Sequence, residues 1–153
     1  MVNATKKNQV DIAANLFREY QSFLGVDLCF QGFEEELAGL PGKYADPYGA
    51  ILLAQYKDEF IGCVAVRPIN ESTCEMKRLY VKPQFQGLKA GRLLAEQIIY
   101  QAKALGYQKM QLDTLERLQA ALKLYESLGF KRINPYYENP LDEVVYLELD
   151  LNN

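Results

Sequence analysis

The sequence predicts an α+β fold in which helices flank one mixed β-sheet. Segments with helical spacing of apolar residues alternate with short segments rich in β-branched and aromatic residues, in the order helix, helix, three strands, helix, strand, helix, two strands. Short polar turns join the first three strands, which indicates an antiparallel meander. A long helix separates the third strand from the fourth, which indicates a crossover and parallel pairing.

Composition is that of one globular domain spanning residues 1–153. Hydrophobic residues make up 49% and charged residues 24%, and the formal net charge is -3. This charge argues against a nucleic-acid-binding module, which usually has a basic face. The N-terminus lacks the apolar core of a signal peptide, and the longest apolar runs are too short to span a bilayer. We therefore expect a soluble, cytoplasmic protein with neither membrane nor nucleic acid as a partner.

Cysteine and histidine usage restricts the chemistry. The three cysteines, Cys29, Cys63 and Cys74, are odd in number and form no C-x-x-C pair, so neither a disulfide framework nor a metal site is predicted. Histidine is absent from the sequence, which excludes Ser-His and Cys-His nucleophilic sites. A general base must then be a carboxylate, a tyrosine, a lysine or a water molecule.

The first half of the chain predicts two helices and the meander. Apolar residues are spaced for a helix over 9–24, which Gly25 ends, and a shorter helix is predicted over 33–40. Strands are predicted over 50–56, 60–67 and 73–82. The loop before the first of these contains Tyr44 and Tyr48, which either form a wall of a substrate site or pack on the core as part of a connector.

The second half predicts two more helices and three more strands. A helix runs from Gly87 or Leu88 to Leu105, followed by a strand over 109–114 and a helix over 116–128. Strands over 130–133 and 143–151 complete the chain. The loop between them is bracketed by prolines and contains Tyr136 and Tyr137.

A glycine-bearing turn between a strand and a helix is the centre of the functional argument. Pro83 ends the strand, because proline has no backbone donor, and the sequence Q-G-L-K-A-G follows at residues 86–91. Unpaired N–H groups and the helix dipole make a helix N-terminus a suitable place for a pyrophosphate. The alternative is that Gly87 and Gly91 only permit tight packing.

This turn resembles the acetyl-CoA loop of the GNAT N-acetyltransferases, Gln/Arg-x-x-Gly-x-Gly/Ala. Lys89 replaces the middle glycine, and it could add charge next to the phosphates. A second motif, A-x-x-L-Y-x-x-L-G-F, is matched by residues 121–130, and the order of elements also agrees. The family's additional first strand would have to lie in residues 2–4. The C-terminal part looks like a subgroup of small bacterial members whose substrate is not assigned.

The resemblance implies transfer of the acetyl group of acetyl-CoA to a primary amine by direct attack in a ternary complex. It implies that the pantetheine arm binds a strand that splays from its parallel neighbour, and that one freed N–H faces the thioester oxygen. A Leu118 in the position of a family asparagine removes one expected contact. The implied CoA-binding residues are Leu79, Tyr80, Val81, Gln86, Gly87, Leu88, Lys89, Ala90, Gly91 and Arg92.

Two residues are implied to be catalytic. Tyr125 corresponds to the family tyrosine that protonates the departing thiolate, although periodicity alone would place it in the core. Glu75 is the candidate base, directly or through a water molecule, and partial burial would raise its pKa. The alternative is that Glu75 faces solvent beside a lysine or arginine. A bulge in its strand would invert the orientation of every later side chain.

The acceptor is less well specified. Four tyrosines are expected to line its pocket, and three acidic residues could attract an amine: Tyr44, Tyr48, Tyr136 and Tyr137, with Asp46, Glu138 and Glu143. A small amine, an amino-acid derivative or a peptide would suit such a site, and a homodimer is compatible with it. The alternatives are a non-catalytic CoA-binding regulatory module and an acyltransferase that uses a longer acyl-CoA.

Overall fold

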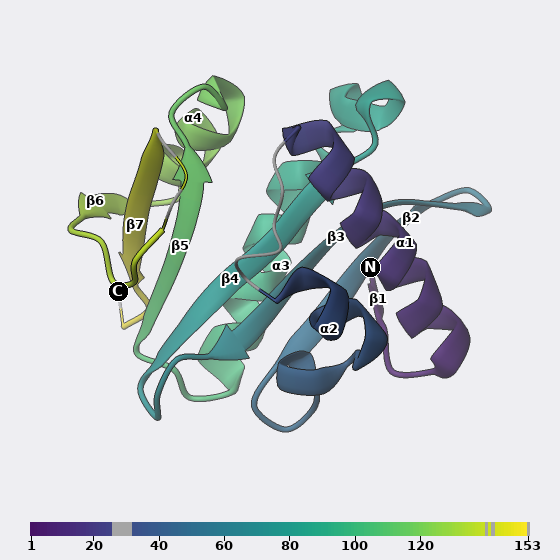
Figure 1. Ribbon diagram of the computed structural model, residues 1–153, viewed down its shortest axis with the longest axis horizontal. Helices are drawn as coiled ribbons and strands as arrows, with labels where there is room; N and C mark the ends of the chain where they lie inside the picture. The colour runs from purple at the N-terminus through teal and green to yellow at the C-terminus, as the bar shows by residue number, and fades with distance from the viewer. Residues whose placement is uncertain (26–31, 140, 142, 153) are drawn as a thin grey trace.

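A seven-stranded mixed sheet with helices on both faces forms the protein (Figure 1), and this confirms the predicted fold class. The computed structural model describes residues 1–25, 32–139, 141 and 143–152. The sheet has the order β1-β2-β3-β4-β5-β7-β6. The strands are β1 Val2–Asn3, β2 Ala50–Tyr56, β3 Glu59–Pro68, β4 Thr73–Val81, β5 Lys109–Leu115, β6 Lys131–Ile133 and β7 Val144–Asp150.

Four α-helices and two short 3-10 helices complete the described chain. They are α1 Lys7–Leu24, α2 Phe33–Ala38, η2 Gly42–Tyr44, η3 Pro83–Leu88, α3 Ala90–Ala104 and α4 Gln119–Ser127. α1 buries Ala13, Leu16 and Phe17 on one face, as its periodicity predicts. It ends at Gly25, whose φ of 68° is the left-handed conformation that glycine adopts without steric cost.

Two helices begin later than the sequence predicts. Pro83 starts η3, and α3 begins only at Ala90, because Lys89 has a φ of 60° that interrupts the helical path. The predicted helix from residue 116 begins at Gln119. The Glu116 N–H donates instead to the Glu143 carbonyl at 2.8 Å, which holds this segment beside β7. The short first strand is present, and Val2 pairs with Leu53 of β2.

The sheet separates two hydrophobic cores. Side chains of α1 and α2, including Phe17 and Phe33, pack on one face, and side chains of α3 and α4, including Ile98 and Leu122, pack on the other. Each face of the sheet therefore has its own cover, and a gap in the sheet would join the two sides. No helix in the described ranges is both long and apolar enough to cross a membrane.

Such a gap lies between β4 and β5, which pair in parallel at their beginnings and then diverge (Figure 1). The last paired residues are Glu75 and Gln111. A bulge follows in β4. Cys63 of β3 pairs with Tyr80, whereas Ala65 pairs with Lys77, so β4 has one extra residue. Arg78, in the bulge, has a φ of 60°. The bulge changes the alternation, as a bulge in this strand was expected to do.

Candidate active site

The divergence of β4 and β5 opens a cleft of about 560 Å³ on the side toward α3 and α4. One wall is the end of β4, and the opposite wall is the beginning of α4 together with the segment before it. The loop before α3 closes one end. The lining of the cleft includes seven of the ten residues predicted to bind CoA: Leu79, Tyr80, Val81, Gln86, Lys89, Gly91 and Arg92. The other three, Gly87 and Leu88 of η3 and Ala90 at the start of α3, do not line the cleft.

The loop places the N-terminus of α3 at the cleft. The first N–H groups of a helix have no carbonyl partner within it, so those at Ala90, Gly91 and Arg92 are suited to an anion. Lys89 adopts the left-handed conformation that explains why glycine is usual at this position of the motif. The Arg92 guanidinium donates to the Ser127 hydroxyl at 2.9 Å, which links α3 to α4 beside the cleft.

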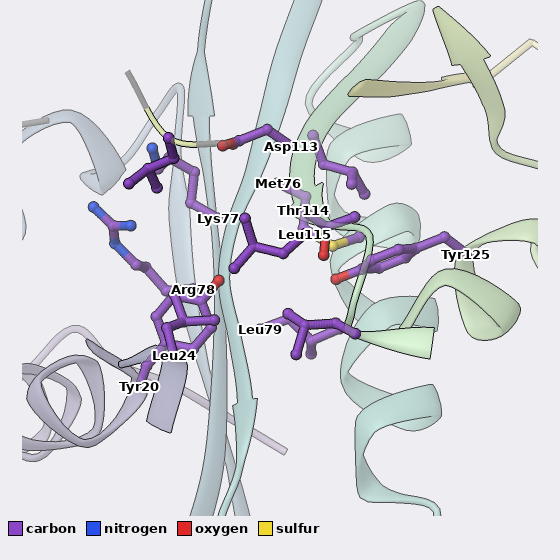
Figure 2. A pocket seen from close by; sticks show the side chains of 13 residues that line it. Tyr20, Leu24, Met76, Lys77, Arg78, Leu79, Asp113, Thr114, Leu115 and Tyr125 are labelled. Atoms are coloured by element: carbon purple, nitrogen blue, oxygen red, sulfur yellow. The ribbon is translucent and has the colours of Figure 1, made fainter. Parts of the chain in front are cut away.

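A small pocket of about 40 Å³ lies deeper, between the diverging strands (Figure 2). Tyr125 of α4 enters it from one side, and its hydroxyl points into the gap near Thr114 of β5. The Tyr125 ring packs edge-on against Phe130, with a centroid distance of 5.7 Å. Burial raises the pKa of Tyr125 above its ordinary value. The hydroxyl is therefore held in its protonated form, which can give a proton but not take one.

Glu75 lies on the opposite face of the sheet from α3 and is 1% exposed. One carboxylate oxygen accepts a hydrogen bond from Arg67 Nε at 2.8 Å, and the other accepts one from the Tyr136 hydroxyl at 2.7 Å. Burial alone would raise the pKa of Glu75, but Lys77, Arg67 and Tyr136 outweigh it, so the pKa lies below its ordinary value. This direction is the reverse of the one the sequence suggests. Glu75 is paired with an arginine, as in the alternative, but it does not face solvent.

Charged side chains surround the inner pocket on the Glu75 side. Lys77 of β4 and Asp113 of β5 both line it, and the Asp113 carboxylate points toward the side on which Lys77 and Arg78 lie (Figure 2). Burial and the nearby Arg78 lower the pKa of Lys77 to about 8, although Glu75 and Asp113 act in the opposite sense. Arg78 donates to both carboxylate oxygens of Glu36, at 3.1 and 3.0 Å.

The loop between β6 and β7 places two predicted tyrosines on the carboxylates of this side. The Tyr137 hydroxyl donates to Asp113 at 2.7 Å, as Tyr136 does to Glu75. The two rings and that of Tyr146 pack together, with centroid distances of 5.3 to 5.6 Å. Burial and the neighbouring carboxylates raise the pKa values of both tyrosines. The two tyrosines thus contact the site through hydrogen bonds to its carboxylates.

The other predicted acceptor residues lie farther out. Tyr44 is buried in the core between α1 and the sheet, where its ring meets Phe17 at 6.1 Å, and it borders a separate surface pocket with Arg67. Tyr48 is 67% exposed, and its carbonyl accepts from the Tyr107 hydroxyl. The three acidic residues that were expected to attract an amine are exposed: Asp46, Glu138 and Glu143.

Sequence reasoning missed the contributions of α1 and β5. Tyr20 borders both the cleft and the inner pocket, and Phe23 borders the cleft. Lys77 and Asp113 were also missed. Glycine and tyrosine motifs give local signals, but only the register of β4 and β5 reveals that these two charged residues face the same pocket. Of the three cysteines, Cys63 and Cys74 are buried and free, and Cys29 lies outside the described residues.

Comparisons with known proteins agree with this fold. The profile of the acetyltransferase (GNAT) family matches residues 13–130. A Schizosaccharomyces pombe protein named as an uncharacterized N-acetyltransferase is 46% identical, over 99% of this chain and 94% of its own length. An acetyltransferase of Streptococcus agalactiae has a similar structure, with a TM-score of 0.79, 21% identity and coverage of 96% of this chain and 95% of that one.

A putative acetyltransferase of Salmonella typhimurium, whose structure contains acetyl-CoA, has a TM-score of 0.72 and 18% identity, covering 97% of this chain and 92% of that one. These last two likenesses concern the fold. The family profile covers most of the chain, and the yeast relative covers nearly all of it. The chain belongs to the GNAT family of acetyltransferases.

Proposed function

We propose that this protein transfers the acetyl group of acetyl-CoA to a primary amine by direct attack in a ternary complex. The observation that carries the proposal is the gap between β4 and β5. A protonated tyrosine, Tyr125, enters it from one side, and a group of charged side chains borders it on the other. A thioester placed in the gap would have a proton donor near its sulfur and room for the amine on the opposite face.

The cleft supports the binding of CoA. The N-terminus of α3 and the cationic Lys89 and Arg92 would hold the pyrophosphate. The backbone of Leu79, Tyr80 and Val81 would pair with the pantetheine amides, taking the place of the missing strand contact with β5. One N–H of this segment would then face the thioester oxygen and stabilise the negative charge that develops on it.

Tyr125 is the proposed general acid. When the C–S bond breaks, the thiolate takes the phenolic proton, and the high pKa of Tyr125 keeps that proton in place until then. Glu75 has a role on the acceptor side. Its low pKa makes it a weak direct base, so its proposed role is to attract and orient the incoming ammonium.

The size of the inner pocket supports a short acyl group. Its volume of about 40 Å³ is a few times the roughly 10–15 Å³ that a cavity needs to hold one water molecule, so it suits a group of only a few heavy atoms. A two-carbon acetyl group needs little more space, whereas a longer chain would require Met76, Leu79 or Leu112 to move. This argues for acetyl-CoA over a longer acyl-CoA.

Calorimetric titration with acetyl-CoA, followed by a screen of amines for release of free CoA thiol, tests the proposal. We expect acetyl-CoA and desulfo-CoA to bind with similar affinity, and at least one amine to accelerate thiol release. Binding without release by any small amine, amino-acid derivative or peptide would favour the regulatory module. Failure of both nucleotides to bind would remove the proposal altogether.

A further inference from the structure

Lys77 occupies a position from which it can act on the acceptor. It lies two residues beyond the last paired residue of β4, Glu75, and its neighbour across the gap is Asp113 of β5. Its residue exposure is 7%, and it lines the inner pocket opposite Tyr125. We propose that Lys77 is the base that takes the proton from the acceptor's ammonium group. This inference rests on the proposed function.

The two carboxylates beside Lys77 are less suited to this step. Glu75 accepts hydrogen bonds from Arg67 and Tyr136, and Asp113 accepts one from Tyr137. Hydrogen bonds to a carboxylate stabilise its charged form and make it a poorer proton acceptor. The two tyrosines therefore each occupy one oxygen of a carboxylate, and Tyr136 helps to keep Glu75 charged. These carboxylates can attract an ammonium to the pocket, which leaves the proton transfer to another group.

The charge balance around Lys77 favours its neutral form when an ammonium enters. Two positive groups in one buried pocket repel each other strongly, since the surrounding dielectric is low. Among the described residues, charged and titratable groups face Lys77 or its immediate partners from several elements: Glu75 and Arg78 of β4, Arg67 of β3, Asp113 of β5, Tyr20 of α1, Glu36 of α2, and Tyr136 and Tyr137 of the β6–β7 loop.

The acceptor ammonium and Lys77 differ little enough in pKa for rapid proton transfer between them. An alkylammonium has a pKa of about 10.4, and burial brings the pKa of Lys77 to about 8. The pKa values of the amine and Lys77 then differ by about two units, whereas those of the amine and an ordinary glutamate differ by roughly six. At pH 7, about a tenth of Lys77 would be neutral, and this fraction would grow with pH.

The acceptor nitrogen loses two protons during the reaction. The ammonium gives one proton to neutral Lys77 and becomes a free amine. The amine nitrogen attacks the thioester carbon and forms the C–N bond, and the C–S bond then breaks. The thiolate takes the Tyr125 proton, and the second proton lost by the nitrogen restores the Tyr125 hydroxyl through solvent. Lys77 releases its proton to solvent after the products leave.

The first test needs no acceptor. Trace labelling of the full chain with acetic anhydride between pH 6 and 11, with peptide mass spectrometry, gives the titration midpoint of Lys77 against free Nα-acetyl-lysine amide as the reference. We expect the Lys77 midpoint about two units below that of the reference, and slower labelling when desulfo-CoA fills the cleft. A Lys77 midpoint equal to that of the reference would overturn the proposal.

The second test uses an amine that the thiol-release screen identifies. Lys77→Arg keeps a buried positive charge but cannot take a proton, so turnover should fall about 100-fold or more, with acetyl-CoA affinity changed less than about threefold. The alkaline rise in rate should also disappear. Lys109→Met, at a half-exposed lysine of β5, is the control and should keep both. Normal turnover and an unchanged pH profile in Lys77→Arg would refute the assignment.

The outcomes separate this inference from the proposed function. If neither CoA compound binds, the proposed function fails, but the labelling still reports the titration of Lys77. If acetyl-CoA binds and an amine is acetylated while Lys77 titrates like the reference, the proposed function stands and only the role of Lys77 is lost.

Discussion

The position of Tyr125 is compatible with both expectations that the sequence raises for it. Its helical spacing predicted a core position, and its motif predicted a catalytic one. The ring is buried against Phe130, while the hydroxyl reaches the inner pocket. A tyrosine can do both because the ring is apolar and only its tip is polar. Burial in the core also fixes the hydroxyl in position, as a proton donor requires.

Replacing Tyr125 by phenylalanine should separate catalysis from binding. The ring packing is kept and only the proton donor is lost, so turnover should fall about 100-fold, with little change in acetyl-CoA affinity. Steady-state kinetics and calorimetry would measure the two effects. Tyr107→Phe is a matched control, because Tyr107 is also buried but its hydroxyl donates to the Tyr48 carbonyl and does not line the cleft. It should lose stability but keep turnover. Equal turnover in Tyr125→Phe and the wild type would remove Tyr125 from the acid role.

Glu75 should contribute stability in a pH-dependent way. Its pKa in the folded state lies below that of an unfolded glutamate, about 4.3. Its charged form therefore stabilises the fold fully above about pH 4.3, and this contribution disappears as pH falls through the lower folded pKa. Urea unfolding should show that Glu75→Gln has a lower free energy of unfolding than the wild type at pH 7, and that this difference shrinks toward pH 3. A difference that is constant across this range would mean that packing, not charge, is responsible.

At the scale of elements, the bulge in β4 is tied to α2. Arg78 lies in the bulge and forms a two-pronged ion pair with Glu36, and its guanidinium lies over the Phe33 ring at 5.2 Å. The side chains of the pair are 3% and 13% exposed. An arginine so deeply buried needs its partner, because water cannot solvate the charge. The pair thus fixes α2 against the strand that borders the inner pocket.

Removing the carboxylate of this pair should be costly. Glu36→Ala should lower the free energy of unfolding by about 3 kcal/mol, because it leaves Arg78 buried without this partner. Glu34→Ala on the same helix is the control. Its pair with Arg18 is more than half exposed on both sides, so its loss should cost less than about 1 kcal/mol. Denaturant unfolding of the wild type and the two variants would measure these losses. Similar losses in both variants would mean that the burial of the pair contributes little.

At the scale of the whole molecule, the sheet consists of two parts that are joined by a short stretch of strand pairing. β4 and β5 pair through only three residues each among the described positions, from Thr73 to Glu75 and from Lys109 to Gln111. Beyond these pairs the gap separates the parts, and α3 and α4 border it on one side. A ligand in the gap would connect the two parts, and its binding energy would add to the stability of the whole fold.

CoA should therefore raise the melting temperature. At a concentration of 100 times its Kd, it should stabilise the protein by about 2.7 kcal/mol. For a chain of this size that corresponds to an increase of roughly 5–10 °C in Tm. Scanning calorimetry would measure it. Adenosine 3′,5′-bisphosphate, which lacks the pantetheine arm, is the control and should give a smaller increase at the same concentration. Equal increases would mean that the arm does not occupy the gap.

The sequence by itself determined the order and type of nearly all the described elements, and the positions of the glycine-bearing turn before α3 and of Tyr125 on α4. These follow from local patterns, since apolar periodicity and turn residues act over a few positions. The starts of α3 and α4 were wrong, because the backbone of Lys89 and the contact of Glu116 with Glu143 override helical spacing.

The tertiary structure alone decided the acceptor side of the site. The bulge at Arg78 set which β4 side chains face the charged group, and the register of β4 and β5 brought Lys77 and Asp113 to one pocket. The same contacts gave Glu75 a low pKa, where burial alone would have raised it. Such interactions join residues far apart in the sequence, for example Asp113 with Tyr137 and Glu75 with Tyr136 at separations of 24 and 61. A pKa depends on the charges nearby in space, and no local pattern contains them.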